Sequence, residues 1–103
     1  MKKVINKKVY NTETAELIAK CGNGLGSSDF RYLFEELYRT KKGQYFLYGE
    51  GGPMTKYSES AGNSSWGIST IIPLTDEEAY EWLEENGKSE SIEKYFKDLI
   101  EEV

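Results

Sequence analysis

The sequence predicts an α+β fold: a small antiparallel sheet of three to four strands, an N-terminal helix and two acidic C-terminal helices. Aromatic and β-branched runs separated by glycine-rich breakers fill the middle of the chain, which is typical of short strands. After residue 75, apolar residues recur at helical spacing. The chain has 103 residues, so we expect a single domain over residues 1–103.

The N-terminal part of the chain predicts a strand followed by a helix. Val4–Tyr10 has the composition of a short strand with basic flanks. Asn11 or Thr12 can cap a helix over Glu13–Lys20, because these side chains accept hydrogen bonds from the first free amides of a helix. The glycines of residues 22–24 would end that helix.

The middle of the chain predicts a β-hairpin. Leu33–Thr40 and Gln44–Gly49 would be its arms, joined by Lys41-Lys42-Gly43, whose glycine can adopt the positive φ of a tight turn. The second arm contains a continuous apolar and aromatic run, Tyr45–Tyr48, which predicts a central strand that is covered on both faces.

The segment after this hairpin is rich in breakers. Met54–Tyr57 predicts a short strand, and Ser58–Gly67 predicts a loop because it is rich in Ser, Gly and Asn. We expect the large side chain of Trp66 to fold back onto the core. Ile68–Leu74 is β-branched and apolar, which predicts a further strand.

The C-terminal region predicts two helices. Thr75 and Glu78 form a capping box that starts the first, and Gly87 stops it. Its buried stripe would consist of Ala79, Trp82 and Leu83. A second helix would start near Ser89 or Ser91. Its apolar face would consist of Ile92, Tyr95, Phe96, Leu99, Ile100 and Val103.

The composition argues against most catalytic chemistries. The chain has no His, which excludes a Ser-His-Asp triad, an imidazole base and a His metal ligand. Its single cysteine, Cys21, leaves no disulfide within the chain and no multi-Cys zinc site. We therefore expect a protein that is not an enzyme and uses no cofactor or metal. The N-terminus has no apolar signal-peptide core, so we expect a cytoplasmic protein.

Charge is unevenly distributed along the chain. Residues 1–75 carry a net charge of +3, and residues 76–103 carry −8. Glu77, Glu81 and Glu84 fall on one side of the first C-terminal helix, opposite its apolar stripe, with Glu85 beside them. This face is either an ordinary solvated surface or a contact for a basic partner. The lysines of the predicted hairpin turn, Lys41 and Lys42, are the alternative contact. We expect no membrane contact, since no apolar run approaches the roughly 20 residues of a membrane span. We also expect no sequence-specific DNA binding, since the protein is acidic overall.

Three stretches carry a family resemblance: residues 8–15 (KVYNTETA), residues 37–52 (LYRTKKGQYFLYGEGG) and residues 71–74 (IIPL), the last followed by an acidic helix. They resemble a family of small proteins from conjugative and phage-like mobile elements of Gram-positive bacteria. This family resembles type II anti-CRISPR proteins. The resemblance implies a non-enzymatic inhibitor that binds a type II CRISPR effector nuclease or its guide complex in the host cell.

Two other functions stay open. The first is an accessory or immunity-type protein that binds another protein of the same mobile element. The second is a nuclease that uses carboxylates and Mg²⁺, because a metal site built only from carboxylates needs no His.

Overall fold

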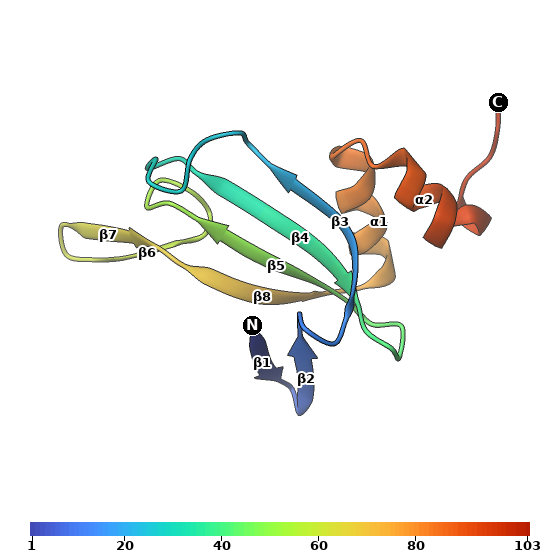
Figure 1. The fold of residues 1–103 in the computed structure, drawn as a ribbon, viewed down its shortest axis with the longest axis horizontal. Helices are drawn as coiled ribbons and strands as arrows, with labels where there is room; N and C mark the ends of the chain where they lie inside the picture. The colour runs from blue at the N-terminus through green and yellow to red at the C-terminus, as the bar shows by residue number, and fades with distance from the viewer.

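The computed structural model describes residues 1–103 and is built around a four-stranded antiparallel sheet, with strand order β3-β4-β5-β8 (Figure 1). The bounds of these strands are β3 Glu16–Gly22, β4 Leu33–Arg39, β5 Tyr45–Gly51 and β8 Ser69–Leu74. Two separate hairpins accompany the sheet: β1 (Lys2–Ile5) with β2 (Lys8–Asn11), and β6 (Ser58–Ala61) with β7 (Ser64–Gly67). The chain ends in α1 (Asp76–Glu85), α2 (Ser89–Tyr95) and a 3₁₀ turn, Lys97–Leu99.

The predicted N-terminal helix is wrong, and with it the predicted fold of one small sheet flanked by three helices. The chain forms eight strands in three sheets, and only its C-terminal part is helical. Asn11 does cap a turn, because its Oδ1 accepts a hydrogen bond from the backbone amide of Glu13 at 2.9 Å. The turn does not continue as a helix, because Glu16–Gly22 pairs with β4 and forms the edge of the central sheet.

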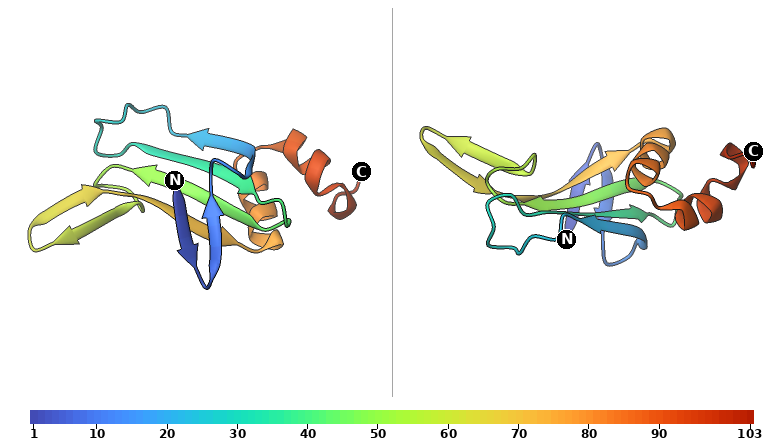
Figure 2. Two further views of the ribbon diagram at one scale, coloured as in Figure 1. Left: turned by 60° about the horizontal axis from the view of Figure 1, so that its bottom comes forward. Right: turned by 90° about the horizontal axis from the view of Figure 1, so that it is seen from above.

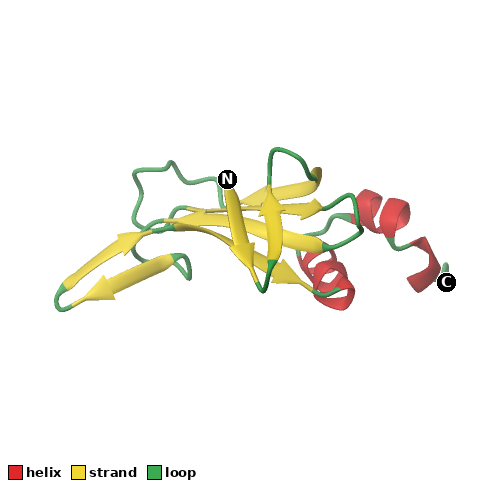
Figure 3. Cartoon of the chain, turned by 90° about the horizontal axis from the view of Figure 1, so that it is seen from below, coloured by secondary structure: helices red, strands yellow, loops and turns green.

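The N-terminal segment also divides differently from the prediction. Val4–Tyr10 is not one strand but parts of β1 and β2, which turn at Asn6 and Lys7. Both residues have a positive φ, 51° and 66°, as a two-residue type I′ hairpin turn requires. This hairpin lies across one face of the central sheet (Figure 3).

The central hairpin is confirmed. β4 and β5 pair in register from Leu33 with Gly51 to Arg39 with Tyr45, and Gly43 turns between them with φ 84°. β5 lies between β4 and β8 and is covered on both faces. Alternate residues of these strands therefore feed two separate cores.

One core lies between the sheet and the C-terminal helices. It contains nine buried residues, with Leu37 and Leu47 from the sheet and Leu83 from α1 near its centre. The other lies under the N-terminal hairpin and contains four: Tyr10, Tyr38, Phe46 and Ile71. Phe46 stacks on Tyr38 at 5.3 Å between ring centroids and meets the ring of Tyr10 edge-on at 5.5 Å.

Residues 54–67 do not form the predicted short strand and loop. Met54–Tyr57 is mostly turn and bend, and 58–67 form the β6–β7 hairpin. This hairpin projects from the end of the sheet that lies away from the helices (Figures 1 and 2). Trp66 belongs to β7 and is 44% exposed, so its predicted return to the core is wrong.

The second C-terminal helix is shorter than its apolar pattern predicts. It ends at Tyr95, and only Ile92 and Phe96 of the predicted face are buried. Leu99, Ile100 and Val103 are exposed, because the 3₁₀ turn that holds Leu99 buries none of its residues and the residues beyond it form no helix or strand. No helix has the length and hydropathy needed to span a membrane.

Candidate functional site

The first helix presents the four predicted glutamates to solvent. α1 starts at the predicted capping box: the amide of Glu78 donates to Thr75 Oγ1 at 3.1 Å, and the amide of Thr75 donates to Glu78 Oε1 at 2.9 Å. Ala79, Trp82 and Leu83 are buried against the sheet, which fixes the rotation of the helix about its axis. The opposite side therefore faces water, and all four candidate carboxylates lie there: Glu77, Glu81, Glu84 and Glu85.

These carboxylates have no cationic partner within the chain. The only side-chain ion pair in the structure joins Lys56 to Glu35, and the last turn of α1 holds no basic residue. Glu84 accepts one hydrogen bond, from the hydroxyl of Tyr80 at 2.6 Å. The acidic face of α1, defined as Glu77, Glu81, Glu84 and Glu85, is thus an exposed surface whose charges are not neutralised by an ion pair within the chain.

The predicted alternative contact, Lys41 and Lys42, lies in the β4–β5 turn and is exposed. The fold brings these two residues next to Lys7 and Lys8. Lys7 lies in the turn of the N-terminal hairpin, and Lys8 is the first residue of β2. Together the four lysines line a hollow of ≈ 590 Å³ between the two turns, and no Asp or Glu lines it. We call this feature the lysine hollow.

The lysine hollow and the acidic face belong to opposite sides of the sheet. Tyr10, which also lines the hollow, packs on Tyr38 and Phe46, whereas α1 packs on Leu37 and Leu47. Neighbouring residues in a strand point to opposite faces. The structure therefore does not bring the two groups of predicted contact residues into one site.

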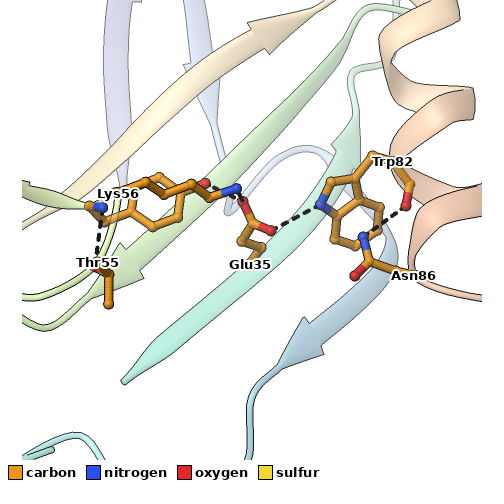
Figure 4. A network of polar contacts seen from close by, with 6 residues as sticks. Glu35, Thr55, Lys56, Trp82 and Asn86 are labelled. Atoms are coloured by element: carbon orange, nitrogen blue, oxygen red, sulfur yellow. Dashed lines mark hydrogen bonds and ion pairs between the residues drawn. The ribbon is translucent and has the colours of Figure 1, made fainter. Parts of the chain in front are cut away.

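Glu35 is the only buried charged residue, and sequence reasoning missed it. It lies on β4, on the helix-covered face, between the sheet and α1 (Figure 4). Its carboxylate accepts hydrogen bonds from Tyr57 Oη and from Trp82 Nε1, the latter at 3.1 Å, and it pairs with Lys56 Nζ at 3.0 Å. The four side chains come from β4, the β5–β6 connection and α1, so this carboxylate joins three parts of the fold.

Room for this network depends on Gly49, the cross-strand neighbour of Glu35 on β5. The ring of Tyr57 lies directly on the backbone of Gly49, and a Cβ at that position would overlap the ring. Glycine thus permits a tyrosine from the connection after β5 to reach the buried carboxylate.

Burial acts to raise the pKa of Glu35, but hydrogen bonds from Tyr57, Lys56 and Trp82 outweigh it and lower the pKa below its ordinary value. For Tyr57, burial and the hydrogen bond to Glu35 both raise the pKa of the hydroxyl. At neutral pH the network therefore holds one carboxylate and one neutral phenol. The carboxylate has three hydrogen-bonding or ion-pair partners, and neither of the two main surface hollows is lined by Glu35. The arrangement ties three parts of the fold together.

A second carboxylate cluster lies on the hairpin-covered face of the sheet. The carboxylate of Glu50 accepts hydrogen bonds from the hydroxyls of Tyr32, at 2.6 Å, and Tyr48. The carboxylate of Glu36 accepts a hydrogen bond from the hydroxyl of Tyr38 at 3.1 Å. The hydrogen bond to Glu50, together with partial burial, raises the pKa of Tyr32 to about 12. Both glutamates are half-buried, and each accepts at least one phenol hydroxyl.

Neither cluster is arranged for metal binding, and no group of three or more His, Cys, Asp or Glu side chains in the structure is placed to hold an ion. Cys21 lies half-buried in β3. Comparisons with known protein families, with curated proteins and with solved structures each found no match.

Proposed function

We propose that this protein is a non-enzymatic inhibitor of a type II CRISPR effector nuclease and binds the effector or its guide complex. The observation that carries the proposal is the acidic face of α1: four exposed carboxylates, without lysine or arginine partners, on a helix whose other side is locked in the core. Effectors of this type hold nucleic acid in positively charged channels. A rigid acidic helix can enter such a channel and compete with the nucleic acid.

The charge distribution supports a local contact rather than imitation of DNA by the whole surface. The acidic residues concentrate after residue 75, and the rest of the chain is net positive. The resemblance of residues 8–15 and 37–52 to mobile-element proteins supports the same function. The proposal places the protein in the cytoplasm of a bacterial host, where such nucleases work.

A target-DNA cleavage assay tests the proposal, with the purified protein added to a type II effector either before or after guide loading. Inhibition only before loading means interference with guide assembly. Inhibition at both stages means blocked DNA binding or a locked nuclease, and a gel shift with target DNA separates these two. No inhibition at large excess over several effectors overturns the proposal. Recovery of an element-encoded partner in a pull-down would then favour an accessory or immunity-type protein.

A charge-reversal variant tests the role of the helix. Replacing Glu77, Glu81, Glu84 and Glu85 with Lys should weaken inhibition at least tenfold, and wild-type binding should weaken as salt is added. The matched control reverses four exposed glutamates beyond α1, with the same change in net charge: Glu90, Glu93, Glu101 and Glu102. Equal losses in both variants would mean that overall charge, not this helix, determines binding.

A further inference from the structure

The lysine hollow gathers positive charge from two turns that are distant in sequence. Lys7 and Lys8 come from the N-terminal hairpin, and Lys41 and Lys42 come from the β4–β5 turn. All four are exposed, and none of their ammonium groups makes an ion pair or a hydrogen bond within the chain. Four like charges around one hollow repel one another, and an anion among them removes that repulsion. The fold therefore gathers four lysines that no single stretch of sequence contains.

The first turn places a lysine where glycine is usual. Lys7 has a φ of 66°, a region in which glycine is much more favourable than lysine. The Asn-Gly pair is the strongest choice for a turn of this type, and here the second position carries a lysine instead. The register pairs Lys8 with Ile5 and Tyr10 with Lys3. Lys8 thus lies on the same face of the hairpin as Tyr10, the residue buried against the sheet.

We propose that the lysine hollow binds the phosphate backbone of single-stranded nucleic acid. Lysine acts as a compact point charge that suits phosphate oxygens without demanding one geometry. A phosphodiester chain supplies regularly spaced anions, so that several lysines bind at once and release counterions together. The hollow lies between two hairpin turns. A flexible single strand can bend between them, whereas duplex DNA is stiff over many base pairs, so we commit to a single strand.

The lining favours the backbone over the bases. The only aromatic residue in it is Tyr10, which is 4% exposed because its ring is packed on Phe46. Proteins that bind single strands through their bases offer exposed aromatic rings for stacking. The hollow offers no such ring. The contact should be independent of nucleotide sequence.

The negative net charge of the protein does not oppose such a contact. The acidic face of α1 lies on the other side of the sheet, and no carboxylate lines the hollow. At an ionic strength of 0.1 M, charges further apart than roughly 10 Å are largely screened from one another. The charged side chains that line the hollow are the four lysines alone.

Fluorescence anisotropy with labelled 20-nucleotide single-stranded RNA and DNA of mixed sequence tests this inference on the purified chain. The slope of log affinity against log salt should be roughly −3 for four phosphate contacts with a single strand. Replacing Lys7, Lys8, Lys41 and Lys42 with Gln should lower affinity at least tenfold and bring the slope near zero. The control replaces four other lysines with Gln, for the same charge change: Lys20, Lys88, Lys94 and Lys97.

Several results would overturn the inference: no binding at 50 mM salt, equal losses in the two variants, or duplex binding as tight as single-strand binding. Competition by tripolyphosphate as effective, per molecule, as competition by an unlabelled 20-mer would assign the hollow to small phosphate anions. Equal competition by poly-Glu would assign it to an acidic polypeptide. Weaker binding of DNA than RNA would restrict the ligand to RNA and keep the inference. No effector is present in this assay, so its outcome is independent of the proposed inhibition.

Discussion

The two faces of the central sheet come from the same strands but are covered in different ways. The helix-covered face holds nine buried residues and the buried Glu35 network. The hairpin-covered face holds four buried residues, and its carboxylates, Glu36 and Glu50, remain half-buried. Two helices cover more apolar surface than a short hairpin whose Val4 and Val9 point into solvent.

The difference shows that the elements packed on each face of the sheet determine whether a carboxylate there needs partners within the protein or is solvated by water. Under the helices, Glu35 is removed from water and needs partners for its charge, which Tyr57, Trp82 and Lys56 provide. Under the hairpin, water reaches Glu50, and its tyrosine partners only supplement solvation. We expect perturbations of the helix-covered face to affect stability more.

The largest expected effect is on the helix-covered core. Leu83→Ala should lower the free energy of unfolding by about 4 kcal/mol, because Leu83 is fully buried and its removal leaves a cavity. Urea denaturation measures this loss. Tyr10→Ala, which loosens only the hairpin, should cost less, since the central sheet keeps its helical cover. A larger loss for Tyr10→Ala would reverse the order of the two faces.

The next effect concerns the buried carboxylate. Glu35→Ala should lower stability by about 2 kcal/mol, because the Tyr57 hydroxyl and the Trp82 indole lose their acceptor. Glu35→Gln keeps an acceptor oxygen and should cost less. Since Lys56 is 62% exposed, Lys56→Gln should have a smaller effect still. Thermal melts of the three variants give this order, and equal losses for all three would contradict it.

The same carboxylate predicts a dependence on pH. The pKa of Glu35 is lower in the folded chain than in the unfolded chain, so the folded state favours the ionised form. That stabilisation is complete above the ordinary carboxyl pKa of 4.5 and is lost as the pH falls through the folded-state value. Urea midpoints between pH 6 and 3 should fall more steeply for the wild type than for Glu35→Gln. Parallel slopes would exclude Glu35 as a source of acid sensitivity.

The smallest effect is on the hairpin-covered face and concerns ionisation more than stability. Removal of the charge by Glu50→Gln should lower the pKa of Tyr32 from about 12 toward 10, because the hydrogen bond to the carboxylate is the main cause of its shift. Absorbance at 295 nm during alkaline titration follows the tyrosines. Glu59→Gln, on the exposed β6–β7 hairpin, is the control and should leave the titration unchanged.

Elements with strong local signals could be predicted from sequence. The β4–β5 hairpin has a glycine at its turn, and α1 has a capping box and an apolar stripe; both form as expected. Residues 13–20 follow an equally plausible helix cap, but Glu16–Gly22 instead pairs with the edge of β4 and forms a strand. Ladder hydrogen bonds formed across the sheet outweigh a weak helix propensity in so short a segment.

The candidate sites likewise include one that local sequence predicts and one that it does not. The exposed glutamates of α1 could be placed from helical spacing alone, because one face of a single helix decides their position. Glu35 gave only a faint signal, as one of two adjacent glutamates in an alternating strand, one of which must point inward. Its partners lie 21 to 47 residues further along the chain, so no local pattern could identify them.

The central hairpin, the start and buried side of α1, and the concentration of negative charge after residue 75 follow from the amino-acid sequence alone. These features depend on neighbours within a few residues, where turn geometry, capping and periodicity act. Packing between distant segments makes residues 16–22 a strand and buries Glu35 with its partners. It also brings Lys7 and Lys8 to the same hollow as Lys41 and Lys42. Each of these depends on which surfaces pack together, and that is a balance of burial and pairing over the whole chain.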